Sequence, residues 1–368
     1  MEHKGGERVA EAVAGAVAVL RTAVDRDWKA VRAGRVEWSC HETAVHIAQD
    51  LIVYAGRLAS RVQDAYRPFD VVVDDSTDNA RALQLVEGGG ALLAATVRTT
   101  PPRVRAYHPR PFLSANPEGF AALAVGEVLL HTHDIAEGLE LVYEPPGELA
   151  EFVLTRMFPH VRPDADHWRT LLWATGRGEL PGREPVTGDW AWYNNLVLDT
   201  GRLTLEALTP AAALDLHLGG DGGFAWVEDG PFEGTRQASG MLAKAYEEGT
   251  HRPGWGVFVL VRRDDGRAVG GMGFHSAPDE DGRAEVGYDL APSARGRGYA
   301  TEALAAMTEW ALAQDGVRSL VATIDHDNAA SQRVVARTGF RRAPAEEERA
   351  VNEERDHDQA LRLYVRHA

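Results

Sequence analysis

The sequence predicts two domains, a helical bundle in the first half of the chain and an α/β domain in the second half. A chain of 368 residues exceeds the size at which a single hydrophobic core keeps growing. Apolar residues recur at helical spacing until shortly before Gly176, whereas from Leu203 onward short β-rich runs alternate with helices. We therefore expect domains at residues 1–190 and 200–368, with a Gly- and Pro-rich surface connector at Gly176–Gly188 between them.

Composition excludes several classes of protein. Hydrophobic residues make up 44% and charged residues 26%, which is ordinary for a folded chain. With a net charge of −16, the chain lacks the excess of basic residues that is typical of proteins that bind nucleic acids or anionic membranes. The single Cys40 excludes an intramolecular disulfide and is typical of a reducing compartment. The apolar run Ala10–Leu20 is too short to span a membrane, and helical spacing continues beyond it, so we expect a cytoplasmic protein without a signal peptide.

The first half contains five segments in which apolar residues face one side of a helix. Asp78 and Asn116 are placed to cap two of them, and Pro117 stands at a first helical position. Val71–Val73 is β-branched but short, so a bundle is the natural packing. The predicted helices are Ala10–Val24, Thr43–Ala59, Asn79–Val97, Pro117–Leu141 and Leu149–Met157.

The second half has the alternation typical of an α/β fold. The acidic stretch Glu346–Asp358 near its end is predicted to be a solvated loop. The predicted strands are Gly256–Arg262, Ala268–Phe274, Ala284–Leu290, Ser319–Ile324 and Ala360–Val365, and the predicted helices are Thr301–Gln314 and Ala329–Arg337.

A phosphate-binding turn stands at the start of one of these helices. The sequence Arg295-Gly296-Arg297-Gly298-Tyr299-Ala300-Thr301 follows a predicted strand and opens an Ala- and Leu-rich helix. Two glycines let backbone N–H groups approach a bound group closely, and the first N–H groups of a helix lack internal partners. With the helix dipole and two arginines, this turn is suited to bind a pyrophosphate.

The turn resembles the acyl-CoA-binding motif of the GNAT N-acetyltransferase superfamily, with Arg295, Gly298 and Ala300 at its defining positions. Asn328 through Gly339-Phe340 resembles the second signature of that superfamily, and Glu285-Val286-Gly287-Tyr288 is similar to its strand that splays open around pantetheine. The resemblance covers about Leu203–Val365 and is closest to the branch of ribosomal-protein N-terminal acetyltransferases. It implies a mixed sheet with a V-shaped opening, and acetyl-CoA as the acetyl donor.

Acetyl transfer to an amine needs a base for the amine and a proton for the leaving thiolate. Glu285 is the candidate base, directly or through water, although it could also be an exposed strand carboxylate. Asn328 would hold pantetheine or a water, and it would cap the helix that follows. The tyrosine that often serves as acid in the superfamily is replaced by Val335, which leaves Ser331 or water as the proton donor.

The first half contains residues with metal-ligand spacing. Glu127 and His131 are four apart and project from one face of a predicted helix, and His46 lies on another. Two histidines and a glutamate are the composition of an open catalytic zinc site, although each could instead be an ordinary hydrogen-bonded side chain. Glu42, four residues before His46, is an alternative ligand.

His46 with Trp38-Ser39-Cys40, together with Glu127-x-x-x-His131-x-x-Asp134, resembles the metal-binding domain of mycothiol-dependent maleylpyruvate isomerase, a member of the DinB-like four-helix superfamily. The stretch from Phe158 to Arg177 is similar to it as well, and the resemblance spans about residues 8–190. It implies that His46, Glu127 and His131 bind a divalent metal, zinc by first choice. Asp134 would then orient one of the ligands.

We therefore expect a bacterial fusion in which an N-acetyltransferase acts on the amine of a small molecule or peptide. One alternative places metal- and thiol-dependent isomerase or transferase chemistry in the first domain. Another makes that domain a non-catalytic binding or dimerisation module. The sequence leaves a homo-oligomer open.

Overall fold

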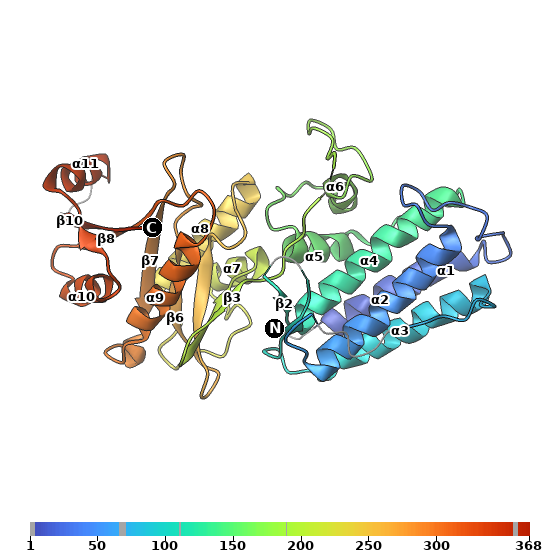
Figure 1. The fold of residues 1–368 in the computed structure, drawn as a ribbon, viewed down its shortest axis with the longest axis horizontal. Coiled ribbons are helices and arrows are strands. Elements are labelled where there is room, and N and C mark those ends of the chain that lie inside the picture. Colours follow the sequence, from blue (N-terminus) through green and yellow to red (C-terminus); the bar gives the residue numbers. More distant parts are fainter. Residues whose placement is uncertain (1–3, 66–70, 110–111, 189, 356–359) are drawn as a thin grey trace. The chain divides into compact units, whose positions relative to one another are not determined.

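The computed structural model divides into two compact units, Met1–Asn194 and Asn195–Ala368, each described here by itself. It describes residues 4–65, 71–109, 112–188, 190–355 and 360–368 (Figure 1). Among these residues, no helix combines the length and the apolar character that crossing a membrane requires.

The first unit consists of helices and one short β-ladder. Its helices begin at favourable residues: Asp78 and Asn116 accept hydrogen bonds from the first turns of α3 and α4, and Pro117 opens α4, as predicted. Val71–Val73 forms no strand. The elements are α1 (Gly5–Arg21), α2 (Cys40–Ser60), α3 (Asn79–Thr99), β1 (Ala106–Tyr107), β2 (Ser114–Ala115), α4 (Pro117–Gly138), α5 (Gly147–Met157) and α6 (His167–Ala174).

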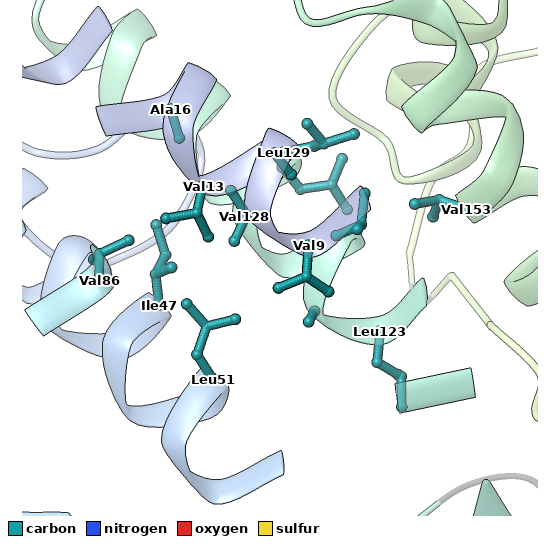
Figure 2. Packing of buried hydrophobic residues seen from close by; sticks show 14 of the residues in the cluster. Val9, Val13, Ala16, Ile47, Leu51, Val86, Leu123, Val128, Leu129 and Val153 are labelled. Atoms are coloured by element: carbon teal, nitrogen blue, oxygen red, sulfur yellow. The ribbon is translucent and has the colours of Figure 1, made fainter. Parts of the chain in front are cut away.

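The four long helices α1 to α4 pack against one another around an apolar core. Figure 2 shows Val9 and Val13 of α1 facing Ile47 and Leu51 of α2, with Val128 of α4 beside them. These side chains are almost completely buried, so their removal from water stabilises the packing of the three helices.

The second unit is built on an eight-stranded sheet with the order β3-β4-β5-β6-β7-β8-β10-β9. Every neighbouring pair is antiparallel except β7 and β8, so the sheet is mixed, as the GNAT resemblance implies. The elements are β3 (Val197–Asp199), β4 (Leu203–Ala207), α7 (Pro210–His217), α8 (Glu233–Glu248), β5 (Val257–Arg262), β6 (Ala268–Phe274), β7 (Arg283–Leu290), η1 (Pro292–Ala294), α9 (Tyr299–Leu312), β8 (Ser319–Asp325), α10 (Ala329–Arg337), β9 (Arg341–Arg342), α11 (Ala345–Arg355) and β10 (Leu361–His367).

Strands β7 and β8 of this sheet separate along their length. The β7–β8 ladder joins Arg283–Glu285 to Ser319–Val321 and ends there. Beyond that point β7 continues alongside β6 up to Leu290, while β8 continues alongside β10. The sheet is therefore split by the opening that the sequence predicts.

Alternating side chains of β5 assign the helices to opposite faces of the sheet. Val257 and Val259 belong to the apolar cluster that includes Leu242 of α8. Phe258, between them in sequence, instead faces Trp310 of α9, with ring centroids 6.5 Å apart. We call the side of the sheet that carries Val257 and Val259 the α8 face, and the side that carries Phe258 the α9 face (Figure 1).

The prediction of a loop in the acidic stretch is wrong for the part that the structure describes, because α11 begins at Ala345. Glutamates in the first turn of a helix are stabilised by the helix dipole. Asn352 then ties the helix to β10, since its amide nitrogen donates to the carbonyl of Leu361 at 2.9 Å and its oxygen accepts from the N–H of the same residue at 2.6 Å. Residues 356–358 lie outside the described residues.

Candidate functional site

The predicted anion-binding turn lies between η1 and α9. Gly296 and Gly298 have φ angles of 73° and 82°, a region that glycine enters without steric cost. Gly298 is the N-cap of α9, and no side chain caps this helix. The first N–H groups of α9, at Tyr299, Ala300 and Thr301, are therefore the kind of groups that bind anions.

The connection between β3 and β4 holds the glycine turn and the start of α9 in place. The Glu302 carboxylate in the first turn of α9 accepts hydrogen bonds from the Thr200 hydroxyl at 2.6 Å and the Arg202 N–H at 2.7 Å. It also forms an ion pair with the Arg202 guanidinium at 2.6 Å. Arg202 in turn donates to the carbonyl of Arg297 at 2.9 Å. Neither Glu302 nor Arg202 was singled out from the sequence, since their contact depends on a fold that brings residues 100 positions apart together.

Arg295 has structural contacts of its own. Its Nε donates to the carbonyl of Leu290 at 3.0 Å, and its guanidinium lies 4.9 Å from the centroid of the Phe232 ring. These contacts fix the side chain at the end of β7. Arg295 thus contributes a positioned charge next to the turn.

Glu285 lies where the β7–β8 ladder ends, at the closed end of the opening. One carboxylate oxygen accepts a hydrogen bond from the Thr323 hydroxyl of β8, and the other lies 3.4 Å from Nδ1 of His275. The Glu285 side chain is 14% exposed and that of His275 43%. His275, which sequence reasoning missed, therefore connects a largely buried carboxylate to solvent.

Asn328 and Ser331 lie at the start of α10. The Asn328 side chain accepts from the Ser331 N–H at 3.0 Å, so it caps this helix as expected. From β7, the Tyr288 hydroxyl donates to the carbonyl of Ser331 at 3.2 Å. Burial raises the pKa of Tyr288 above its ordinary value despite this hydrogen bond, which keeps the hydroxyl protonated at neutral pH. Tyr288 is a second residue that the sequence did not reveal.

In the first unit, the structure brings together the three predicted metal ligands. One donor atom from each of His46 (α2), Glu127 and His131 (both α4) lies within 4.8 Å of the others. Nε2 of His131 lies 3.1 Å from the Glu127 carboxylate, and Nε2 of His46 lies 3.9 Å from the same oxygen. The ring of Trp38 packs on His46, with centroids 4.6 Å apart.

The carboxylate of Asp134 holds His131 of this cluster in place. Asp134 is fully buried, accepts a hydrogen bond from Nδ1 of His131 at 3.1 Å, and is held by Nε and Nη2 of Arg177 at 3.0 and 2.9 Å. Burial alone would lower the pKa of His131, but the hydrogen bonds to Asp134 and Glu127 outweigh it and raise that pKa to about 9. Burial would likewise raise the pKa of Glu127, yet His131 and His46 hold it below the ordinary value. Arg177 lies in the predicted surface connector, which therefore also supports the cluster.

The alternative ligand Glu42 has another role. Its carboxylate accepts from the backbone N–H and the hydroxyl of Ser39, both at 2.8 Å, and completes the capping box of α2. Cys40 is buried, and burial raises the pKa of its thiol to about 11, as expected for a small packing residue. Asp50 is a carboxylate that the prediction did not include, 3.4 Å from Nε2 of His46.

Comparison with known proteins places similarity in the second unit. Residues 202–341 match the protein-family model described as an acetyltransferase (GNAT) domain. Over 154 residues the chain is 32% identical to the uncharacterized N-acetyltransferase YjdG of Bacillus subtilis (strain 168), a match that covers 39% of this chain and 89% of that protein. Over 151 residues it is 28% identical to the uncharacterized N-acetyltransferase YoaA of the same strain, with 40% and 83% covered.

Solved structures are similar as well. An acetyltransferase of the GNAT family from Bacillus anthracis shares 19% identity at a TM-score of 0.34, with 47% of this chain and 98% of that chain covered. The ribosomal L7/L12 alpha-N-protein acetyltransferase RimL shares 19% identity at a TM-score of 0.33, with 46% and 97% covered.

Proposed function

This chain belongs to the GNAT acetyltransferase family, and from that premise we propose that its second unit transfers the acetyl group of acetyl-CoA to an amine at the opening between β7 and β8. One observation carries the proposal: the β7–β8 ladder ends at Glu285 of β7, and the connection from β7 to β8 contains the start of α9, whose N-cap is Gly298. An anion site and a carboxylate at a split in the sheet are the two groups that this reaction requires.

The residues of the turn fit the pyrophosphate of acetyl-CoA. Gly298 has no Cβ, so a phosphate can approach the N–H groups of Tyr299, Ala300 and Thr301. Arg295 and Arg297 add positive charge beside them. Gly296 is open on its Cβ side, where a side chain would meet no atom within 4 Å.

When bound, acetyl-CoA supplies a thioester whose carbonyl carbon an amine can attack. Glu285 takes the proton of the amine, directly or through a water, and Thr323 and His275 hold its two oxygens in place. Asn328 orients pantetheine or a water while it caps α10. A hydrogen bond to one oxygen and a close imidazole contact to the other support a fixed base rather than a freely rotating surface carboxylate.

Three groups are candidates to protonate the leaving thiolate. The sequence points to Ser331 or water, and the geometry adds Tyr288, whose hydroxyl lies 3.2 Å from the Ser331 carbonyl. Tyr288 on β7 would thus act as the acid in place of the tyrosine that many members of the superfamily have at the position of Val335 on α10. Burial raises the pKa of its hydroxyl, so the group carries its proton at neutral pH, as a donor must before the reaction.

The test is acetyl transfer by the full chain to a panel of amines that includes small primary amines and short peptides. Release of the free thiol of CoA, followed by colour reaction, measures turnover, and mass spectrometry identifies the acetylated product. Thiol release that depends on the amine supports the proposal. Acetyl-CoA binding without transfer to any amine would argue against it.

For the first unit we propose a divalent metal site formed by His46, Glu127 and His131, with zinc as the first choice. Two ligands about 2.0–2.1 Å from a tetrahedral zinc lie roughly 3.3–3.4 Å apart. The separations of 3.1 and 3.9 Å from the Glu127 oxygen lie on either side of that value, and all three donor atoms are within 4.8 Å of one another. Asp134 fixes the ring of His131, as carboxylates commonly do for zinc-bound histidines. Nickel or another divalent ion would also accept these ligands.

The metal would lower the pKa of a bound low-molecular-weight thiol, which is the thiol-dependent isomerase or transferase alternative. Elemental analysis of the purified full chain separates this from a non-catalytic binding or dimerisation module. One equivalent of metal supports the first alternative, and a metal-free chain with intact acetyl transfer supports the second.

A further inference from the structure

A cavity of about 310 Å³ lies on the α8 face of the sheet in the second unit. It is bounded by α8, by β6 and β7, and by the segment that leads into β5. The volume is at the lower end of the range for small-molecule sites. The family comparisons assign nothing to this cavity.

The floor of the cavity is bare backbone. Gly273 of β6 pairs with Gly287 of β7, and Gly271 pairs with Asp289. A Cβ at Gly287 would come within 3.1 Å of Nε2 of His275, and one at Gly271 within 2.6 Å of the Thr235 hydroxyl. The imidazole of His275 and the side chain of Thr235 therefore lie directly over these two glycines, in room that a Cβ would take from them.

The cavity has a polar group at each end of this floor. At one end, the Asp289 carboxylate accepts hydrogen bonds from the N–H and hydroxyl of Thr235, which fixes the start of α8 on β7. At the other end lies His275, whose N–H donates to the carbonyl of Glu285 at 3.0 Å. Glu285, Gly287 and Asp289 alternate along β7, so their side-chain positions share one face. The candidate base is therefore on the cavity side of the sheet.

The walls between these ends are largely apolar. Met241 and Leu242 of α8 stand on one side and Trp255 on another. Met241 is 50% exposed and forms an apolar rim. At about 30 Å³ for each water-sized group, the cavity holds roughly ten non-hydrogen atoms.

We infer that this cavity binds the acceptor, and that the acceptor is a small primary amine with an apolar body rather than the N-terminus of a protein. The inference rests on the proposed function, because it uses Glu285 as the base. An alkyl or aryl group fits the apolar walls, and the amine lies at the His275 end of the floor, where Nδ1 of His275 is 3.4 Å from the Glu285 carboxylate. A polypeptide would need a polar groove for its main chain, whereas α8 is fixed over this cavity by Thr235 and Asp289.

The reaction balances with these groups. The ammonium of the acceptor gives one proton to Glu285, and its nitrogen then bonds to the acetyl carbon as the carbon–sulfur bond breaks. The sulfur takes a proton from the donor proposed above, Tyr288, Ser331 or water, which is restored by the second proton of the nitrogen, so that an amide and a free thiol remain. His275, on the exposed side of Glu285, returns the first proton to solvent.

A series of linear primary alkylamines tests the inference in the full chain. Each buried methylene should raise kcat/KM about fourfold until the cavity is full, after which the value falls. Met241→Ala widens the rim and should move the optimum to longer chains. Ala238→Leu narrows the cavity and should move it to shorter ones. Leu214→Ala, an exposed α7 leucine outside the cavity lining, should leave the optimum unchanged.

Two outcomes would overturn the inference: kcat/KM that does not depend on chain length, or peptide N-termini that react while alkylamines do not. Calorimetric titration with acetyl-CoA, carried out in parallel, distinguishes a failure of this inference from a failure of the proposed function. A chain that binds acetyl-CoA and prefers peptides retains the proposed function and loses this inference. A chain that binds no acetyl-CoA loses both. If Ala238→Leu does not fold, Met241→Ala and its control decide alone.

Discussion

Glu302 is the residue whose removal should most clearly reveal how the anion-binding turn is held. Its side chain is 19% exposed and accepts hydrogen bonds from Thr200 and from the Arg202 backbone, besides its ion pair with the Arg202 guanidinium. Two lost hydrogen bonds cost about 1 kcal/mol each, and the half-exposed ion pair adds at most about 1 kcal/mol. We expect Glu302→Ala to lower the free energy of unfolding of the second unit by about 2–3 kcal/mol.

The loss should also weaken acetyl-CoA binding, because Arg202 then no longer holds the carbonyl of Arg297. Differential scanning calorimetry should show the transition of the second unit roughly 5–10 °C lower in Glu302→Ala. Isothermal titration with acetyl-CoA measures the affinity. The control is Glu309→Ala, which removes an exposed glutamate from the same helix. Equal transition temperatures for Glu302→Ala and the control would refute the reasoning.

The same contacts give this prediction a pH dependence. Burial alone would raise the pKa of Glu302, but the hydrogen bonds from Thr200 and Arg202 hold it below the ordinary value of 4.5. A lowered pKa in the folded state means that the stabilisation is fully present above pH 4.5 and is lost as the pH falls through the folded value. The difference between wild type and Glu302→Ala should therefore be largest near neutral pH and shrink in acid.

The remaining predictions concern the proposed chemistry. Glu285→Gln should lower turnover roughly 10²–10⁴-fold with acetyl-CoA affinity nearly unchanged, and near-normal rates across pH would assign the base to water or to the substrate. Tyr288→Phe should lower kcat at least about tenfold, while Ser331→Ala should have little effect; the reverse pattern would identify Ser331 as the proton donor. His131→Ala and Glu127→Ala should each reduce metal content after dialysis, measured by elemental analysis, without loss of acetyl transfer, and metal contents equal to wild type would exclude the site.

Local patterns predicted several elements of the second unit well. Helix α10 has the predicted bounds Ala329–Arg337, and strand β6 the predicted bounds Ala268–Phe274. Both are bounded by clear turn residues, such as Gly266 before β6 and Gly339 after α10. Helix α8 was not predicted, since few of its residues are apolar and those that are buried face the sheet.

Roles that depend on tertiary contacts could not be predicted from the sequence. His275 meets Glu285 only through the register of β6 and β7. Asp134 and Arg177 are 43 positions apart and meet because the segment after α6 returns to α4. The metal ligands were selected from spacing on one helix, but the proximity of His46 depends on how α2 packs on α4.

The central claim is that the turn at Gly298 binds acetyl-CoA, and calorimetric titration of two matched variants tests it most directly. Asparagine and aspartate have nearly the same shape, and both tolerate the positive φ of 82° at this residue. Only aspartate, however, places a negative charge at the start of α9. The account predicts that Gly298→Asn retains measurable acetyl-CoA binding and that Gly298→Asp loses it while remaining folded. Equal affinity in the two variants and in wild type would contradict the account.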